Sequence, residues 1–178
     1  IIPVWNGAGV ILDCLRAVYA HSGEPLLEVI AVDNASPDES TQLIHDNFPQ
    51  VTLLRQPINL GFAGGVNAGI DAARGEVFIL LNQDCLVQPG WLDAVMQALH
   101  DHPDMDIAGC TIFNADGSLN HTGAYLQRPS AVGVHITDRV ADAPQPVEYV
   151  TGAAMVIRRS AWNTIGRFDE GFYPAYFE

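Results

Sequence analysis

Two acidic residues in this chain directly follow apolar segments that are typical of buried strands. Asp33 comes after LLEVIAV, and Asp84 comes after VFILLNQ. A carboxylate at the end of an apolar strand is costly to desolvate unless it is hydrogen-bonded, paired with a cation or bound to a metal ion. No basic residue lies near Asp84 in the sequence, and the nearest one before it is Arg74. We therefore expect Asp84 to bind Mg²⁺ or Mn²⁺, together with water and phosphate oxygens.

The polar neighbours of these strands also have purely structural explanations. Asn82 precedes Asp84 by two residues on the same side of the expected strand, so it either orients a ribose hydroxyl or caps the strand end. Asp33 opens VDNASPDES, a pattern that by itself favours a local turn into the next helix. The functional alternative for Asp33 is contact with the edge of a nucleobase.

The segment NLGFAGGVNAG, residues 59–69, is rich in glycine but lacks the common phosphate-binding patterns. The G-x-G-x-x-G dinucleotide spacing is absent, and a Walker A loop would need Gly-Lys followed by Ser or Thr. These glycines permit close approach of the backbone to an anion at a helix N-terminus. Close packing of the helix on a sheet explains them equally well, and both explanations stay open.

Strand and helix patterns alternate over the first hundred residues. The strand patterns fall at 1–5, 26–36, 51–56 and 75–84, and the helical patterns fall at 9–21, 36–48, 64–74 and 90–102. This alternation predicts an α/β fold with one Rossmann-like, mostly parallel sheet flanked by helices, and ligands bound beyond the carboxyl ends of the strands. The second helix is expected to begin with Ser36 as its N-cap and Pro37 at its first position.

The pattern loosens after residue 103 and predicts a smaller antiparallel part. An Asp116-Gly117 turn indicates a hairpin, and a further strand is followed by a short helix near Ser160. We expect a single domain, with a nucleotide-binding half at 1–103 and a sugar- or acceptor-binding half at 104–178. Both ends, IIPVW and GFYPAYFE, read as interior sequence, so we expect a piece of a longer chain.

Composition excludes two broad classes of protein. The net charge is −13, from 8 basic and 21 acidic residues, which disfavours electrostatic binding of nucleic acid. No apolar run reaches the roughly 18 residues that indicate a membrane span. Cys14, Cys85 and Cys110 are widely spaced and fit no zinc pattern, which favours a reducing cytosolic setting. His121 and His135 are candidates for a further metal ligand, but a lone loop histidine is more often solvated, so both are interpreted as solvated residues outside the site.

The motifs follow the order found in a known enzyme family. IIPVWN, VDNASPDES, NLGFAGGVNAG, LLNQD and TGAAMVIRR…GRFDEGFYPAYFE resemble the successive motifs of family-2 glycosyltransferases with the GT-A fold, and are most like the bacterial rhamnosyltransferase-type branch. The resemblance covers nearly the whole chain. It implies a nucleotide-diphosphate sugar donor of the dTDP-rhamnose or UDP-sugar class and a glycan or glycolipid acceptor in a surface polysaccharide. It also implies a cytoplasmic location at the inner face of the bacterial plasma membrane, with peripheral membrane association through regions outside this sequence.

The resemblance also assigns roles to individual residues. It implies that the nucleobase pocket is lined by Pro3, Trp5, Asn6 and Asp33. Gly61 and Asn67 would contact the diphosphate, and Gly152 and Ala153 would contact the sugar or the acceptor. Asn82-Gln83-Asp84 stands where the family has its Asp-x-Asp motif, which makes Asp84 the metal ligand. The first acid of that motif is Asn82 here, so the motif supplies a single carboxylate.

The implied reaction inverts the configuration of the sugar and needs a general base. The family's base usually belongs to a Glu-Asp pair; if Glu178 is that glutamate, the usual base is the next residue, outside this sequence. Within the sequence Glu178 is the best-placed candidate, whereas Asp169 and Glu170 are interpreted as turn or capping residues. A base of this kind contributes roughly 10²–10⁴-fold, while a metal ion stabilises the departing diphosphate.

Three other classes of protein were weighed against this family. A nucleotidyltransferase should carry a basic, Gly-rich loop after the first strand, and PVWNGAGVIL has none. A Rossmann oxidoreductase would need the dinucleotide fingerprint, which is absent. A non-catalytic nucleotide-sugar-binding module of the same fold stays open, because the chain lacks a complete pair of catalytic acids.

Overall fold

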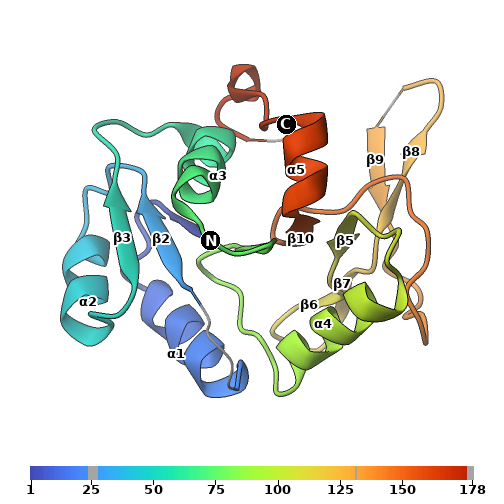
Figure 1. Cartoon of the computed structure of the whole chain (residues 1–178), viewed down its shortest axis with the longest axis horizontal. Coiled ribbons are helices and arrows are strands. Elements are labelled where there is room, and N and C mark those ends of the chain that lie inside the picture. The colour runs from blue at the N-terminus through green and yellow to red at the C-terminus, as the bar shows by residue number, and fades with distance from the viewer. Residues whose placement is uncertain (24–27, 131, 176–178) are drawn as a thin grey trace.

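The computed structural model describes residues 1–23, 28–130 and 132–175. Its helices and strands alternate as the sequence predicts (Figure 1). In chain order they are β1 (Ile2–Val4), α1 (Ile11–His21), β2 (Ile30–Asp33), α2 (Ser40–Asn47), β3 (Thr52–Arg55), α3 (Gly61–Ala72), β4 (Val77–Leu81), α4 (Trp91–Asp101), β5 (Ile107–Gly109), β6 (Ile112–Phe113), β7 (Leu119–His121), β8 (Ala124–Gln127), β9 (Val132–His135), β10 (Ala154–Arg158), α5 (Arg159–Ile165) and the 3-10 helix η1 (Glu170–Phe172). Among the described residues, no helix has the length and apolar character that a membrane span requires.

The first three strands form the parallel sheet that the alternation predicts, in the order β1-β2-β3. Their register sets Val4 opposite Asp33, and Asp33 opposite Arg55. The Leu81 N–H donates to the Ile1 carbonyl at 3.0 Å and so brings β4 beside β1. The carboxyl ends of β1, β2 and β4 therefore meet at one edge.

The second sheet is antiparallel, in the order β4-β10-β5. The predicted fold class is confirmed: β1 to β3 are parallel and β4 lies beside β1, whereas β4 and β5 each pair antiparallel with β10. The chain reaches β10 through the long excursion of residues 110–153, which ends antiparallel to β4. The smaller antiparallel part is confirmed. Its hairpin turns at Asp116-Gly117, where Gly117 has φ +84°, a conformation that glycine adopts without strain.

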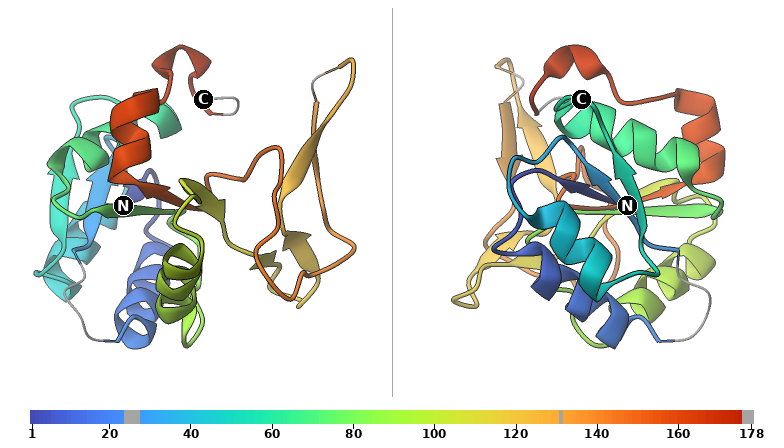
Figure 2. Two further views of the ribbon diagram at one scale, coloured as in Figure 1. Left: turned by 45° about the vertical axis from the view of Figure 1, so that its right-hand side comes forward. Right: turned by 90° about the vertical axis from the view of Figure 1, so that its left-hand side faces the viewer.

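Helices cover both faces of the joined sheets and bury two apolar clusters (Figure 1). On one face α1 and α2 pack against the strands, and on the other α3 and α5 do so. The fully buried side chains include Ile11, Leu15 and Ile44 on the first face and Val66, Phe78 and Leu80 on the second. The β8–β9 hairpin projects away from this body (Figure 2).

The helix α2 begins later than predicted, at Ser40, so the assignment of Ser36 as N-cap and Pro37 as first residue is wrong. The side chains before it bond the loop after β1 instead. Ser36 Oγ accepts the N–H of residue 6 at 3.1 Å, Asp38 Oδ2 accepts that of residue 8 at 2.8 Å, and Ser40 Oγ accepts that of residue 7 at 2.8 Å. These bonds hold the 6–8 loop in place, and they account for the polar VDNASPDES motif.

Candidate functional site

The polar residues that follow β1, β2 and β4 lie along one edge of the joined sheets. We call it the polar edge, formed by residues 5–7, 33–34 and 82–84. The Asn34 N–H donates to the Val4 carbonyl at 2.7 Å, which extends the β1–β2 pairing by one residue. The expectation that these strand ends share an edge is therefore confirmed.

Gln83 ties the loop after β1 to the turn after β4. Its Oε1 accepts the Trp5 backbone N–H at 3.1 Å, and its Nε2 donates to the Trp5 carbonyl at 3.0 Å. The Trp5 side chain is 51% exposed at the polar edge, while Asn6 has a left-handed φ of +51°. Sequence reasoning missed this role of Gln83, since its partner lies 78 residues away.

We predict that Gly7→Ala loosens this connection. A Cβ at Gly7 would overlap Gln83 Oε1 and lie 2.9 Å from its Cδ, so the side chain must leave its two bonds to Trp5. We expect nucleotide affinity to fall roughly 3- to 10-fold with little change in stability, the effect of losing one or two ordinary hydrogen bonds. Calorimetric titration measures this, with Gly9→Ala as the control because a Cβ at Gly9 meets nothing within 4 Å. Equal affinities in the two variants would contradict the prediction.

Asp33 is the buried carboxylate of the polar edge, with an exposed fraction of 0%. Its Oδ1 accepts the Ser36 N–H at 3.0 Å, so the local turn that the pattern favours is present. Its Oδ2 has no hydrogen-bond partner among the described residues and lies 3.5 Å from Arg55 Nε, on a side chain that is itself largely exposed. The turn therefore uses one oxygen, and the other lies beside the Arg55 guanidinium.

Asn34 is a buried member of the polar edge that sequence reasoning did not single out. Its Nδ2 donates to the Gly61 carbonyl at 2.9 Å, and its Oδ1 has no hydrogen-bond partner among the described residues. A Cβ at Gly65 would lie 2.8 Å from Asn34 Nδ2, so the glycine lets the helix approach this amide. Asn34 thus joins the end of β2 to the start of α3.

Asp84 does not end a buried strand. β4 stops at Leu81, and residues 82–84 form a turn closed by the Cys85 N–H on the Asn82 carbonyl at 3.1 Å. Asp84 is exposed, and no hydrogen bond or ion pair to it is found within the described residues. The expectation that its burial demands a partner is therefore wrong, since the turn carries the side chain outward. The carboxylate that is desolvated by burial is that of Asp33 instead.

The Gly152-Ala153 segment lies directly beside this turn. The Ala153 carbonyl accepts the Asn82 N–H at 2.9 Å and the Cys85 thiol at 3.2 Å. A Cβ at Gly152 would overlap the Phe62 ring, so only glycine permits the close approach of this segment to α3. The segment supports the 82–84 turn from the side opposite β1.

The other residues expected to bind the donor have varied surroundings. Pro3 is half-buried within β1, opposite Val32. Gly61 and Asn67 contact the C-terminal segment of the chain: a Cβ at Gly61 would lie 2.7 Å from the Pro174 carbonyl oxygen, and the Asn67 amide bonds residues 168 and 170. Glu178 lies outside the described residues.

The three cysteines are free, and all have pKa values above the usual range. Burial raises the pKa of Cys14 to about 12 and that of Cys85 to about 11, and it also raises the pKa of Cys110. The raised pKa values disfavour the thiolate form. The thiols of Cys14 and Cys85 lie against the backbone carbonyls of Asn82 and Ala153, beside the 82–84 turn.

His121 is fully buried, so its interpretation as a solvated loop residue is wrong. It ends β7 with its ring edge-on to that of His135, which is exposed, at a centroid distance of 4.6 Å. Its Nε2 accepts the Thr151 N–H at 3.4 Å. Burial, and secondarily the charge of His135, lowers the pKa of His121 to about 4.

The low pKa of His121 predicts a loss of stability in mild acid. The unfolded chain takes up this proton near pH 6.5, whereas the folded protein does so only near pH 4. The free energy of unfolding therefore falls as the pH drops from 6.5 to 4. Thermal melts across this window should show a shallower dependence for His121→Leu than for His45→Leu, which removes an exposed histidine. Parallel pH profiles for the two variants would contradict the prediction.

Comparison with known proteins shows which family the chain matches. Residues 1–166 match the family described as glycosyl transferase family 2. The chain belongs to this family. Over 203 residues it is 27% identical to N-acetylglucosaminyl-diphospho-decaprenol L-rhamnosyltransferase of Mycobacterium tuberculosis, covering 97% of this chain and 65% of that protein. It is 24% identical to the O-antigen biosynthesis protein RfbC of Myxococcus xanthus over 97% of this chain, but over only 14% of that protein. The family and the likeness to rhamnosyltransferases are thus confirmed, and the chain spans less than two thirds of either relative.

Solved structures confirm the GT-A fold. A mannosyltransferase from Pyrobaculum calidifontis in complex with GDP-Man and Mn²⁺ is 18% identical with a TM-score of 0.67, over 95% of this chain and 46% of that chain. TarS 1–349 of S. aureus in complex with UDP is 19% identical with a TM-score of 0.59, over 66% and 36% of the two chains. The nucleotidyltransferase and oxidoreductase alternatives are therefore set aside for this family-2 chain.

The residues present fit a divalent metal ion held largely by a ligand's phosphates. Among the described residues, no group of three or more His, Cys, Asp or Glu side chains is arranged to hold a metal by itself. Asp84 offers one exposed carboxylate. Mg²⁺ and similar ions are commonly bound by one or two carboxylates together with water and substrate phosphates, so this donor set suits a metal that arrives with a nucleotide.

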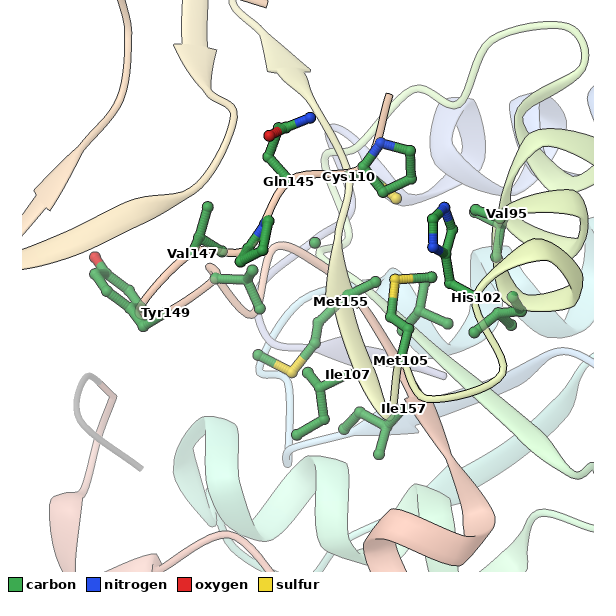
Figure 3. Close-up of a pocket in the computed structure, with 18 of the residues that line it drawn as sticks. Val95, His102, Met105, Ile107, Cys110, Gln145, Val147, Tyr149, Met155 and Ile157 are labelled. Atoms are coloured by element: carbon green, nitrogen blue, oxygen red, sulfur yellow. The ribbon is translucent and has the colours of Figure 1, made fainter. Parts of the chain in front are cut away.

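A large groove of about 1160 Å³ lies apart from the polar edge, between α4, β5, β10 and residues 141–150. Figure 3 shows its largely apolar lining, with Val95, Met105 and Met155 around a space that His102 and Gln145 border. Neither Asp33 nor Asp84 is among its lining residues. The groove is therefore distinct from the site expected to bind the donor.

Proposed function

We propose that this chain is the catalytic domain of an inverting, metal-dependent glycosyltransferase. It transfers a sugar from a nucleotide-diphosphate donor, of the dTDP-rhamnose or UDP-sugar class, to an acceptor hydroxyl of a cell-surface polysaccharide or lipid-linked glycan. The relative from Mycobacterium tuberculosis, named for rhamnosyl transfer to a diphospho-decaprenol acceptor, supports this choice of donor and acceptor. A cytoplasmic location at the inner face of the plasma membrane is part of the proposal.

The observation that carries the proposal is the pairing of a buried and an exposed carboxylate along the polar edge. Asp33 Oδ2 is buried beside Arg55 and has no hydrogen bond among the described residues, so we assign it as the acceptor for a ring N–H of the nucleobase, which would replace Arg55 there. The exposed indole of Trp5 offers a surface on which the base can stack. Asn82 belongs to the same turn as Asp84, and we assign it to a ribose hydroxyl.

Charge along this edge favours a metal-assisted mechanism. The chain contains no lysine, and Arg55 is already paired with Asp33. Asp84 would hold the cation, which supplies charge neutralisation for the departing diphosphate when bound. Gln83 and Ala153 hold the backbone of the 82–84 turn, which positions the residue that carries the carboxylate.

We place the general base outside the described residues. Asp169 accepts the Gly171 N–H at 2.8 Å and caps η1, and Glu170 accepts a hydrogen bond from Asn67 at 2.9 Å. The sequence-based interpretation of Asp169 as a capping residue is thus confirmed. We assign acceptor deprotonation to Glu178 or to the residue after it. The acceptor oxygen then attacks the anomeric carbon from the face opposite the diphosphate, and the bond from that carbon to the diphosphate oxygen breaks.

The alternative is a nucleotide-sugar-binding module without turnover. Titration of the wild-type chain with UDP, dTDP and GDP, each with Mn²⁺ or Mg²⁺ and then with EDTA, tests the donor site common to both proposals. Binding of one nucleotide that EDTA abolishes supports it and narrows the donor; no binding with any metal would overturn it. Release of nucleotide from the matching nucleotide-sugar then separates the transferase from the module.

A further inference from the structure

The segment of residues 167–174, which follows α5, lies across α3 (Figures 1 and 2). We call it the C-terminal strap. At its start Arg167 Nη1 bonds both carboxylate oxygens of Asp71, at 2.9 and 2.7 Å. Both of these side chains are about half exposed, so this ion pair contributes little stability by itself.

The main contact of the C-terminal strap is with Asn67, which is 1% exposed. Asn67 Oδ1 accepts the Phe168 N–H at 3.1 Å, and its Nδ2 donates to the Phe168 carbonyl at 3.0 Å. The same Nδ2 donates to Glu170 Oε1 at 2.9 Å. Both N–H groups of the amide and its oxygen are therefore used by one stretch of chain about 100 residues away.

These hydrogen bonds fix the register of the C-terminal strap along α3. An apolar side chain at this position would leave the Phe168 N–H, the Phe168 carbonyl and the Glu170 carboxylate without this partner, which is costly for any of these groups that stays buried. The amide also discriminates between registers of the strap. A strap shifted by one residue would place another residue at the Phe168 position and would move the Glu170 carboxylate out of reach of Asn67. Fully bonded polar contacts of this kind specify one arrangement.

A continuous set of contacts connects the C-terminal strap to the polar edge. The Phe168 ring packs edge-on against Phe62, with centroids 6.0 Å apart. Phe62 in turn lies against Gly152, where a Cβ would overlap its ring. The next residue, Ala153, accepts the Asn82 N–H through its carbonyl at 2.9 Å. A shift of the strap at Phe168 would therefore displace Phe62 and the 152–153 segment, and with them the turn that carries Asp84.

A second connection runs through the first turn of α3. The Phe62 N–H donates to the Pro174 carbonyl at 2.9 Å, which occupies a helix N-terminal donor that an anion would otherwise use. The neighbouring Gly61 carbonyl accepts the Asn34 amide at 2.9 Å. The strap, α3 and the end of β2 are thus joined by hydrogen bonds.

We infer that Asn67 is a positioning residue for sugar transfer: it holds the C-terminal strap in one register on α3, and the strap holds the 152–153 segment against the Asn82–Asp84 turn. Asn67 then acts through Phe168 and Phe62 without touching the substrate. This inference rests on the proposed function, since it assigns that turn to the donor. It also gives Asn67 a role other than the diphosphate contact that the family resemblance implies.

A reversal of hydrogen-bond polarity tests the inference. Asn67→Asp keeps the size of the side chain but sets two carboxylates, those of residues 67 and 170, against each other. Adding Glu170→Gln restores a donor to that pair, because the glutamine amide donates to the new aspartate. Asn47→Asp, at an exposed asparagine of α2 that bonds the Leu43 carbonyl, is the matched control.

Two measurements on the full-length protein separate positioning from stability. Hydrogen exchange of peptides covering the strap reports its attachment, and we expect at least about 10-fold faster exchange in Asn67→Asp, the effect of roughly 1.4 kcal/mol of lost interaction. Steady-state kinetics with the nucleotide-sugar that binds in the titration should show kcat lowered about 10-fold, while nucleotide Kd changes less than about 3-fold, since the groups that contact the nucleotide are intact. The double variant should recover part of both losses, because the contact with residue 170 is restored while the bond to the Phe168 carbonyl stays lost.

The outcomes are distinct. Faster strap exchange and lower kcat in Asn67→Asp, partly recovered in the double variant and absent in Asn47→Asp, support the inference. A double variant no better than Asn67→Asp, or equal losses of kcat and affinity, would overturn it and leave Asn67 a structural residue. Wild-type protein that binds no nucleotide would instead overturn the proposed function, whereas wild-type turnover that Asn67→Asp retains would overturn this inference alone.

Discussion

Replacing Asp84 with alanine is expected to abolish metal-dependent nucleotide binding while leaving the fold intact. Asp84 is exposed, and no bond to it is found among the described residues, so its removal costs the native structure little. Loss of residues that merely orient metal ligands weakens metal binding 10–100-fold, so loss of the one carboxylate that we assign to the metal among the described residues should cost roughly 100-fold or more in affinity. Calorimetric titration with Mn²⁺ measures the loss, and thermal melting checks the fold.

Asp106→Ala is the matched control for this experiment. Asp106 is also an exposed aspartate, but it precedes β5 at the opposite edge of the sheet, where its carbonyl accepts the Arg158 N–H at 3.0 Å. Its substitution leaves that backbone bond in place and should not change nucleotide affinity. If Asp84→Ala binds nucleotide and Mn²⁺ as tightly as Asp106→Ala does, Asp84 is not the metal ligand and the resemblance describes only the fold.

Asp33→Ala is expected to weaken both stability and nucleotide binding. The substitution leaves the Ser36 N–H without its acceptor, which costs about 1–3 kcal/mol for a buried donor. Arg55 adds little to this cost, because its side chain is 64% exposed and stays hydrated. A hydrogen bond between Oδ2 and the nucleobase is of the charged type, so its loss should lower affinity about 10- to 100-fold.

Chemical denaturation and titration of the same samples separate these two effects. Asp46→Ala, at an exposed aspartate on α2, is the control for general loss of a carboxylate. Titration below the unfolding transition isolates the binding term from the stability term. Unchanged affinity in a folded Asp33→Ala protein would show that Asp33 is only a turn residue, as its local sequence pattern favours.

The order of strands and helices could be predicted from the sequence because periodicity reflects burial. Apolar runs and helical faces identified β1 to β4 and α1 to α4 within a few residues, and the polar ends of those runs located the polar edge. Boundaries were less accurate where side chains act at a distance. Ser36 has the composition of an N-cap, yet its hydroxyl bonds the loop after β1, so α2 begins at Ser40.

The direction of the last central strand could not be predicted from local pattern. β10 is an apolar run like the others, but it pairs antiparallel between β4 and β5. Pairing depends on how the chain returns to the sheet, and the excursion of residues 110–153 carries no periodicity that reports its path. His121 shows the same limit, because its burial comes from packing beside His135 and not from its neighbours in sequence.

The sequence by itself determined the family, the alternating fold and the set of polar residues at the strand ends. Only the tertiary structure decided which carboxylate is buried: Asp33 is buried, whereas Asp84 is exposed. It also decided that Gln83 bonds Trp5 and that Asn67 bonds the C-terminal strap, across 78 and about 100 residues of sequence. The physical reason is that side-chain type and spacing specify which groups need partners, whereas the partners themselves are supplied by segments that meet only when the sheet and its helices have packed.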